Sequence, residues 1–333
     1  NRKDAPTYTF YDGPPTANGK PHIGHVLTRV IKDMIPRFQT MKGKYVPRKA
    51  GWDTHGLPVE LEVEKLLHIN GKDQIEAYGL EPFIEKCKES VWKYKGMWED
   101  FSRTVGFWAD MEHPYVTYHD DFIESEWWAL KQIWDRGLLY RGFKIVPYCP
   151  RCGTPLSSHE VAQGYKDVKE RSAVAKFRVK GEDAFFLAWT TTPWTIPGNY
   201  AICLNAEFDY VLLQVPGGDV YVLAKDLAES VCKAAGIDYA ACTVLATLKG
   251  SAFELMCAKH PLFDRESVIL NGEHVTLDAG SGCVHTAPGF GAEDFQICQQ
   301  YDKAGLTHIG VPVPVNAKGV MTDERYNGQF YAK

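Results

Sequence analysis

A loop rich in glycine and proline near the N-terminus constrains the fold of this chain more than any other segment. It runs from Asp12 to Pro21 and follows residues 8–11, an aromatic and β-branched stretch typical of a short strand. Residues 26–34 then carry apolar side chains at helical spacing, and Pro21 is well placed to start that helix. A strand, a glycine loop and a helix N-terminus in this order form a natural seat for phosphate. The order predicts the start of a nucleotide-binding α/β domain.

Two histidines stand at the predicted start of this helix. His22 and His25 are three residues apart and would share one face of the first turn, and Gly24 between them would let a flat ring lie close to the backbone. Two imidazoles there can donate hydrogen bonds to a phosphate whose charge grows during nucleotidyl transfer. The alternative is that both are ordinary helix-start residues, since histidine has many structural roles.

The chain changes character after Tyr165. Short β-type runs then alternate with glycine turns, and one helix over 226–235 interrupts them. Many short strands with turn signals predict a barrel-like β domain. The expected strands are 173–179, 185–191, 211–215, 220–224 and 268–270. We therefore expect two domains, residues 1–164 and 165–333, in accord with the length of 333 residues.

Two further helices are expected in the first domain, over 83–104 and 121–137. The second carries a stripe of large apolar side chains, and such a stripe usually packs into a core. The stripe consists of Ile123, Trp127, Leu130 and Trp134.

Composition excludes several classes of protein. Hydrophobic residues are 45% and charged residues 24%, as in an ordinary globular protein, and no apolar run approaches the ~18 residues of a membrane span. A net charge of −5 argues against a chain that grips nucleic acid along its whole surface, although Lys42, Lys44, Arg48 and Lys49 offer a local basic patch or a solvated loop. No signal-type segment follows the N-terminus, so we expect a cytoplasmic protein, and the missing initiator Met suggests a cut from a longer chain.

Nine cysteines are scattered along the chain, and only Cys149 and Cys152 are closely spaced. This fits a reducing compartment better than a disulfide framework. A Cys-x-x-Cys turn has the geometry of half a tetrahedral zinc site, but a structural site needs four ligands and no second close pair exists. The alternative is two ordinary buried cysteines.

Three groups of polar residues are candidates for binding or hydrolysis. Asp53 follows the predicted end of a strand, where a carboxylate can hold an ammonium group or simply cap a turn. Residues 190–192 place three threonines at a strand end, where hydroxyls can hold a sugar or a water, although threonine is also a common residue of ordinary strands. His285 follows a Gly-Ser-Gly segment, and Asp294 stands at a helix start, where it could be a plain dipole partner. Cys283 beside His285 suggests a thiol nucleophile, but packing is the favoured interpretation.

These segments resemble class I aminoacyl-tRNA synthetases, and isoleucyl-tRNA synthetases in particular. Gly13–His25 is similar to the HIGH signature of that class. Gly51–Glu60 has the sequence Gly-Trp-Asp-Thr-His-Gly-Leu-Pro-Val-Glu. This segment distinguishes the isoleucyl family better, because its valyl and leucyl relatives have different sequences there. Thr190–Thr195 and Gly280–Gly289 resemble the editing insertion of the family. With Tyr148–Gly153, the resemblance covers nearly the whole chain.

The resemblance implies a Rossmann-like (HUP-type) nucleotide-binding half-domain with an inserted β-barrel-like editing domain (CP1-type). It implies ATP-dependent activation of isoleucine with Mg²⁺, transfer to tRNA(Ile), and hydrolysis of mischarged valyl-tRNA(Ile). His22, Gly24 and His25 would serve activation, Asp53 would hold the substrate ammonium, and Gly13 and Pro14 would shape the amino-acid pocket.

In the editing domain the resemblance assigns the mischarged amino acid's ammonium to Asp294. His285 and the threonine peptide, with Thr191, Thr192 and Thr195, would contact the terminal adenosine and the ester. Phe290 departs from the family pattern, which favours a small polar residue or His there.

The family also uses a lysine-rich loop, Lys-Met-Ser-Lys-Ser, on the far side of ATP, and no Lys-Met-Ser-Lys occurs here. We therefore expect that this chain alone cannot make the adenylate at a useful rate. Zn²⁺ is expected in the full-length enzyme, where further cysteines would complete the site of Cys149 and Cys152. The resemblance favours a monomer with no membrane contact.

Two alternatives stay open. A valyl-tRNA synthetase is disfavoured by the wording at Gly51–Glu60, and a non-catalytic module could hold a tRNA end without hydrolysis. A nucleotide-binding dehydrogenase is a poor fit, because no Gly-x-Gly-x-x-Gly follows the first strand.

Overall fold

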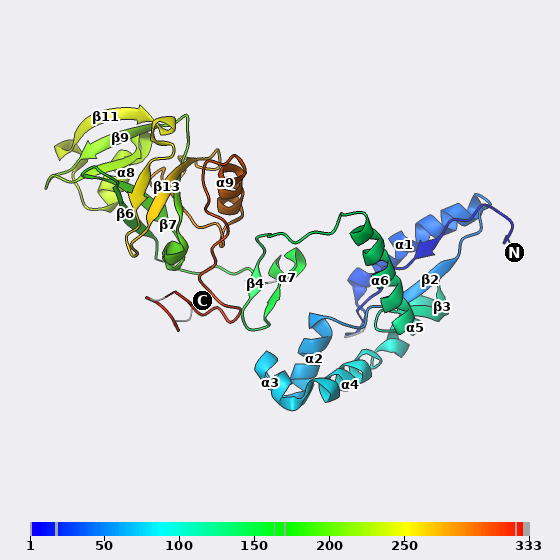
Figure 1. Cartoon of the computed structure of the whole chain (residues 1–333). Coiled ribbons are helices and arrows are strands. Elements are labelled where there is room, and N and C mark those ends of the chain that lie inside the picture. The colour runs from blue at the N-terminus through cyan, green and yellow to red at the C-terminus, as the bar shows by residue number, and fades with distance from the viewer. Residues whose placement is uncertain (1, 17–18, 163, 170, 324, 329–333) are drawn as a thin grey trace. The chain divides into compact units, whose positions relative to one another are not determined.

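The chain forms two compact units, residues 1–141 and 142–333, in a computed structural model (Figure 1). The structure describes residues 2–16, 19–162, 164–169, 171–323 and 325–328. The expected domain division between residues 164 and 165 stays a prediction.

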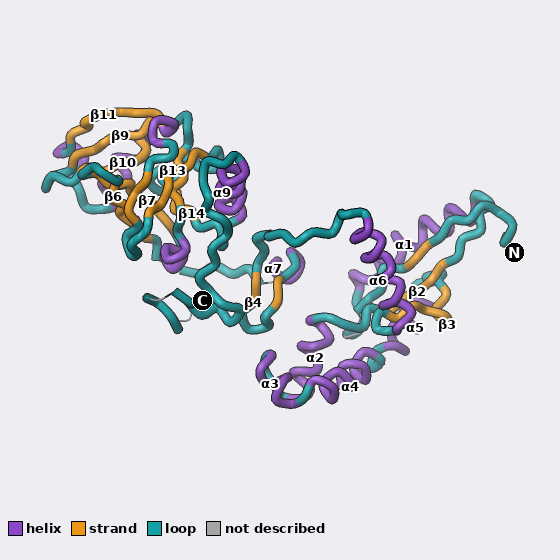
Figure 2. The backbone as a smooth tube through the Cα atoms, in the orientation of Figure 1, coloured by secondary structure: helices purple, strands orange, loops and turns teal. Residues whose placement is uncertain are grey.

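The first unit is built on a small parallel sheet, as the loop and helix order predicted. β1 (Phe10–Tyr11) and β3 (Asp110–Val116) flank β2 (Arg48–Trp52), and both pairings are parallel. α1 (Ile23–Met41) connects β1 to β2, which makes a strand–helix–strand unit (Figure 2). The carboxyl ends of such strands meet at one edge of the sheet, where α/β proteins bind ligands.

Five more helices complete the first unit. They are α2 (Leu57–Leu67), α3 (Lys72–Tyr78), α4 (Leu80–Val91), α5 (Lys95–Thr104) and α6 (Asp120–Asp135). The single helix predicted over 83–104 is wrong: it divides into α4 and α5 because residues 92–94 form tight turns. Trp52, Trp98 and Val116 form one small core of this unit.

The expected burial of the aromatic stripe on α6 is wrong. In the described part of the chain α6 has no buried residue, and Trp127 and Trp134 are 68% and 63% exposed. Helical spacing shows which face of a helix is apolar, but it does not show what covers that face.

The second unit begins with a hairpin and a short helix, β4 (Tyr148–Cys149), β5 (Thr154–Pro155) and α7 (Ser158–Ala162). Six strands then close a barrel, because the order β7-β14-β8-β13-β12-β6 returns from β6 to β7. They are β6 (Ala173–Val179), β7 (Ala184–Thr190), β8 (Ala201–Leu204), β12 (Cys257–Lys259), β13 (Glu266–Asn271) and β14 (Val284–Thr286). The predicted barrel-like β domain is confirmed.

Three strands extend the barrel sheet from β7. They are β10 (Val220–Ala224), β9 (Asp209–Gln214) and β11 (Thr243–Lys249). Two helices and four 3-10 turns lie between the strands or after them: α8 (Ala228–Ala234), α9 (Ala292–Lys303), η1 (Pro193–Gly198), η2 (Lys225–Leu227), η3 (Tyr239–Ala241) and η4 (Gly250–Phe253). No helix among the described residues has the length and apolar character that crossing a bilayer requires.

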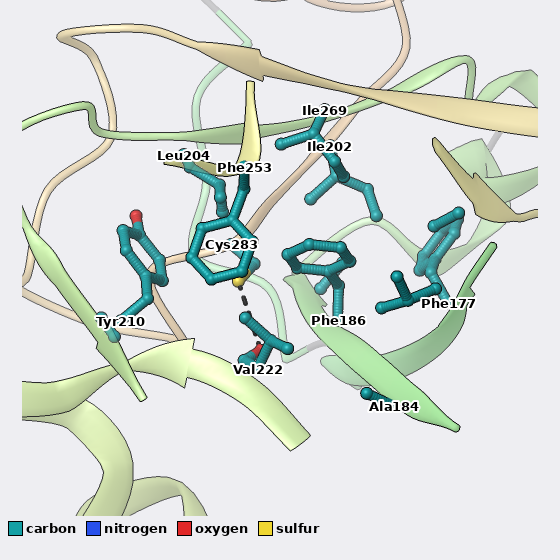
Figure 3. Close-up of a cluster of buried hydrophobic side chains, with 14 residues drawn as sticks. Phe177, Ala184, Phe186, Ile202, Leu204, Tyr210, Val222, Phe253, Ile269 and Cys283 are labelled. Carbon is teal, nitrogen blue, oxygen red and sulfur yellow. Dashed lines mark hydrogen bonds between the residues drawn. The ribbon is translucent and has the colours of Figure 1, made fainter. Parts of the chain in front are cut away.

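An apolar cluster fills the barrel (Figure 3). Phe186 from β7 and Ile202 from β8 are fully buried in it. Cys283 lies in the same cluster, 1% exposed, with its Sγ 3.6 Å from the Val222 carbonyl oxygen. Burial raises the pKa of this thiol, so Cys283 packs in the core and is unsuited to nucleophilic attack.

Candidate functional site

The loop after β1 lies against the end of β2 and brings Asp53 into contact with it. Asp53 donates its backbone N–H to the Pro15 carbonyl oxygen (3.2 Å) and accepts a hydrogen bond from the Thr16 hydroxyl at Oδ2 (3.1 Å). The predicted strand-end carboxylate therefore lies on the glycine loop. No hydrogen bond among the described residues joins Asp53 to either histidine.

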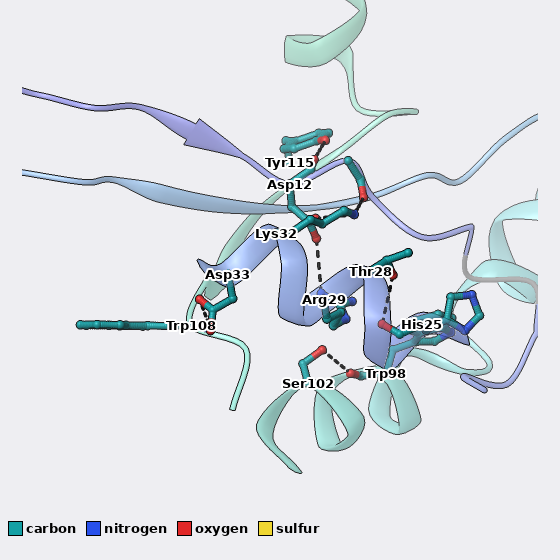
Figure 4. A network of polar contacts seen from close by, with 11 residues as sticks. Asp12, His25, Thr28, Arg29, Lys32, Asp33, Trp98, Ser102, Trp108 and Tyr115 are labelled. Atoms are coloured by element: carbon teal, nitrogen blue, oxygen red, sulfur yellow. Dashed lines mark hydrogen bonds and ion pairs between the residues drawn. The ribbon is translucent and has the colours of Figure 1, made fainter. Parts of the chain in front are cut away.

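A buried carboxylate fixes the start of this loop (Figure 4). Asp12 is 2% exposed and pairs with Arg29 (3.4 Å) and Lys32 (2.9 Å), which both project from α1. Lys32 also donates to the Gly13 carbonyl oxygen (2.6 Å), and the Tyr115 hydroxyl donates to the Asp12 carbonyl oxygen. These contacts tie the loop to α1 and β3, and Pro14 lies half-buried next in the chain.

The two histidines form the N-terminal cap of α1. The helix begins at Ile23 and not at Pro21, so His22 is the capping residue. His22 Nδ1 accepts the N–H of Gly24 (3.2 Å), and His25 Nδ1 accepts the N–H of His22 (3.0 Å). A neutral imidazole whose Nδ1 accepts must carry its proton on Nε2. The ring centroids are 3.7 Å apart, so the capping presents two adjacent N–H donors.

The surroundings of His25 favour its neutral form. Partial burial, and the positive charges of His22, Arg29 and Lys32, lower the pKa of His25. A Cβ on Gly24 would lie 3.0 Å from the His22 ring, so a larger residue would press on that imidazole. The structural and functional interpretations of these histidines are therefore compatible.

The threonine run at the end of β7 folds into a turn stabilised by its own side chains. Thr192 donates its backbone N–H to Thr190 Oγ1 (3.0 Å), and the Thr195 hydroxyl donates to the Thr192 carbonyl oxygen (2.7 Å). Thr195 is buried, whereas Thr191 is exposed. The turn continues as η1 and ends at Asn199.

His285 on β14 joins this turn through both ring nitrogens. Nε2 lies 2.8 Å from Thr195 Oγ1, and Nδ1 lies 2.8 Å from Asn199 Nδ2. Asn199 Nδ2 also donates to the Ala201 carbonyl oxygen (2.7 Å), which can only accept. This fixes the amide orientation, so His285 Nδ1 accepts and Nε2–H donates to Thr195.

His285 therefore stays neutral. Burial, with a further contribution from His260, lowers its pKa to about 4. Its one lone pair is already occupied by Asn199, so it is poorly suited to take a proton from water. The ring instead fixes the direction of the Thr195 hydroxyl.

Sequence reasoning missed Asn199 and Ser267. Asn199 is fully buried, and Ser267 donates to its Oδ1 (2.6 Å). A serine that opens the apolar run at 267–270 was an available signal, because a polar residue at an inward strand position needs a hydrogen-bond partner. Asn199 gave no such signal, since Pro-Gly-Asn is typical of any turn.

Asp294 in the first turn of α9 holds the backbone that follows His285. Its Oδ2 accepts the N–H of Ala287 (2.8 Å), while no hydrogen bond to Oδ1 is found among the described residues. Burial raises the pKa of Asp294 to about 6, the Ala287 N–H opposes the shift, and Glu293 adds to it. His285 and Ala287 are two residues apart, so one short segment joins Asp294 to the threonine turn.

Two glycine segments near the site allow close packing. A Cβ on Gly282 would lie 2.3 Å from the Ala224 Cβ, so the Gly-Ser-Gly segment packs closely against the end of β10. A Cβ on Gly198 would lie 2.5 Å from the Phe290 ring. Phe290, the departure from the family pattern, therefore packs directly on the threonine turn.

Cys149 and Cys152 lie at the β4–β5 hairpin. The N–H of Cys152 donates to Cys149 Sγ (3.4 Å). Burial raises the pKa of Cys149, but hydrogen bonds from Cys152 and Arg151 and the charge of Arg151 outweigh it, so the net shift is downward. Within the described residues no three His, Cys, Asp or Glu side chains gather in a metal-binding cluster, and a structural zinc site needs four ligands.

Comparisons with known proteins give the family of the chain and its relatives. A family model described as tRNA synthetases class I (I, L, M and V) matches residues 1–263. The isoleucine–tRNA ligase of Clostridium kluyveri is 57% identical over 307 residues, which are 91% of this chain and 29% of the relative. That of Bacillus thuringiensis is 49% identical over 331 residues, 97% of this chain and 30% of the relative. The chain thus spans about 30% of the length of these curated relatives.

A solved structure of the P. knowlesi cytosolic leucyl-tRNA synthetase editing domain is a weaker match. The TM-score is 0.36 and the identity 13%, over 40% of this chain and 62% of that chain.

Proposed function

The chain belongs to the class I tRNA synthetases of the isoleucine, leucine, methionine and valine group, and we propose that it is part of an isoleucine–tRNA ligase. In that proposal the first unit contributes half of the site that activates isoleucine with ATP, and the barrel hydrolyses valyl-tRNA(Ile). The relatives' names and the discriminating Gly51–Glu60 segment support isoleucine over valine.

We propose that the activation site works by positioning and charge. The Nε2–H groups of His22 and His25 would donate to the ATP phosphates as negative charge develops on them. Asp53 would hold the isoleucine ammonium, and Gly13 and Pro14 would shape the pocket for the amino acid. Mg²⁺ would accompany ATP and neutralise phosphate charge.

The editing site would hold an ester without forming a covalent intermediate. The free Oδ1 of Asp294 would accept the substrate ammonium, and Thr195, directed by His285, would lie at the ester. Thr191 and Thr192 would contact the terminal adenosine. Because an aminoacyl ester is already activated, orienting it and a water is sufficient for hydrolysis. The contact between His285 and Thr195, which joins β14 to the threonine turn, is the observation that carries this proposal.

A second site is needed for an energetic reason. One methylene separates valine from isoleucine by only about 1–3 kcal/mol in an apolar pocket, and isoleucyl-tRNA synthetases are the usual illustration of this limit. A hydrolytic pocket that admits valine and excludes isoleucine supplies the missing selectivity.

The test is deacylation of preformed valyl-tRNA(Ile) by the chain and by its Asp294→Ala variant. We expect hydrolysis by the parent and persistence of the ester with the variant. A parent that binds the tRNA end but does not hydrolyse it supports the binding-module alternative. Equal rates for parent and variant contradict the role of Asp294.

We propose that Cys149 and Cys152 bind Zn²⁺ only where further ligands complete the site, as expected in the full-length enzyme. The half-site carries no catalytic step here. We further propose a monomer in the cytoplasm, in accord with the unpaired cysteines.

A further inference from the structure

The backbone of the threonine turn is anchored by side chains from the segment between β12 and β13. Three carbonyl oxygens at the end of the turn accept hydrogen bonds from only two side chains, His260 and Arg265. The accepting residues are Ile196, Pro197 and Asn199. These three residues follow Thr195 closely in the chain, and the last of them, Asn199, contacts His285 with its side chain.

Arg265 makes the larger share of these contacts. Its Nη2 donates to the Pro197 carbonyl oxygen and to the Asn199 carbonyl oxygen (2.9 Å). The guanidinium carbon lies 4.3 Å from the ring centroid of Tyr200 and 4.8 Å from that of Phe263. Contact with two aromatic rings holds the planar guanidinium in place, which the point charge of a lysine would not reproduce.

Two residues near the start of β13 bind Asn199, one through its backbone and one through its side chain. Arg265 and Ser267 are two residues apart, and alternate residues of a strand share a face. Arg265 binds the backbone carbonyl of Asn199, and Ser267 binds its side-chain oxygen. Glu266 between them pairs with Lys180 on the exposed side.

His260 adds the third contact as a neutral ring. Its Nδ1 accepts the N–H groups of Leu262 (3.0 Å) and Phe263 (3.2 Å), so its proton is on Nε2 and is donated to Ile196 (2.9 Å). His260 is 2% exposed. The ring therefore acts as a fixed donor next to the guanidinium.

We propose that Arg265 is a positioning residue for ester hydrolysis: it fixes the turn that sets the direction of the Asn199, His285 and Thr195 hydrogen bonds. This inference rests on the hydrolytic function proposed above. Arg265 touches neither His285 nor Thr195, so its effect reaches the ester only through the backbone of the turn.

The test is Arg265→Ala, which leaves a gap between two aromatic rings and two carbonyl oxygens that guanidinium ion can fill. We expect kcat for valyl-tRNA(Ile) hydrolysis to fall by about tenfold to a hundredfold, as for loss of a charge-assisted hydrogen bond, with KM changed little. Millimolar guanidinium should restore much of the loss, whereas an equal concentration of urea should not. A merely structural role would not give this selective rescue.

Arg178→Ala is the matched control. Arg178 is an exposed arginine on β6 that pairs with Asp183 (3.0 Å) and contacts no part of the turn. We expect its kcat to equal that of the parent, with no response to guanidinium. If Arg265→Ala fails to fold by circular dichroism, Arg265→Lys replaces it, with a similar kcat loss expected in a folded chain. A folded Arg265 variant with parental kcat, or an Arg265→Ala variant that guanidinium cannot rescue, overturns the proposal.

A second readout separates this inference from the proposed function. The His285 Nε2–H proton, seen by nitrogen-resolved NMR, should exchange faster with solvent in the Arg265 variant than in the parent or in Arg178→Ala. If the parent does not hydrolyse valyl-tRNA(Ile), the proposed function fails while this measurement still decides the positioning role. Unchanged exchange in the Arg265 variant contradicts it.

Discussion

Replacing Asp294 with asparagine removes the charge of this side chain and keeps an oxygen for the Ala287 N–H. The carboxylate is largely buried, and burial raises its pKa from 3.8 to about 6. A raised pKa in a carboxyl group means that the folded chain binds the proton more tightly than the unfolded chain does. The ionised form therefore destabilises the fold above pH 6, and asparagine relieves this cost.

The size of the effect follows from the pKa shift. A shift of roughly two units corresponds to about 3 kcal/mol of destabilisation by the charge once both states are ionised, near pH 7.5. Near pH 5 Asp294 stays largely protonated in the folded chain, and linkage leaves roughly half of this destabilisation. The stability gain of Asp294→Asn over the parent should thus grow by on the order of 1 kcal/mol from pH 5 to pH 7.5.

Urea unfolding of parent and variant at both pH values measures this difference, and other titrating groups cancel in the comparison. Deacylation should move in the opposite direction. The variant should lose hydrolysis of valyl-tRNA(Ile), while the parent's kcat/KM should rise with pH through about 6 as Asp294 ionises. If the difference in unfolding free energy between variant and parent is no larger at pH 7.5 than at pH 5, the buried Asp294 charge does not destabilise the fold, and this reasoning is refuted.

One assay of the unchanged chain and two substitutions have defined outcomes. The chain should show no isoleucine-dependent pyrophosphate exchange, because it lacks a Lys-Met-Ser-Lys loop; robust exchange would disprove this. Cys283→Ala should lower the free energy of unfolding by about 1 kcal/mol through lost packing and leave deacylation intact. Loss of deacylation in a folded variant would instead support the interpretation of this thiol as a nucleophile. Gly51→Ala places a Cβ 2.3 Å from the Tyr115 ring, so the first unit should lose about 1–3 kcal/mol of stability by overpacking, and thermal unfolding with parental stability would contradict that contact.

The fold was predictable where the sequence signal is local. The glycine loop before α1 and the short runs after Tyr165 predicted a parallel α/β unit and a barrel, and β6 and β10 have the bounds expected from their apolar runs. Closure of the barrel between β6 and β7 depends on long-range pairing, which no local pattern contains. The exposed face of α6 was mispredicted for the same reason, since its partner is not encoded in its own spacing.

The sequence predicted which types of residue form the site, but it predicted fewer of the hydrogen bonds that connect them. His285 and Thr195 were expected together, and the structure joins them. Their link through Asn199 to Ser267 and Arg265 was not foreseen, because these residues lie on separate strands and carry no motif of their own. The Nδ1 contacts of His22 and His25 were also unforeseen, since they depend on the position of the helix start.

The most direct measurement is a single-turnover comparison of valyl-tRNA(Ile) and isoleucyl-tRNA(Ile) with excess chain at pH 7.5. The account predicts rapid loss of the valyl ester and a rate for the isoleucyl ester close to that of spontaneous hydrolysis. Equal enzymatic rates for the two esters would contradict the claim that this barrel separates amino acids by size.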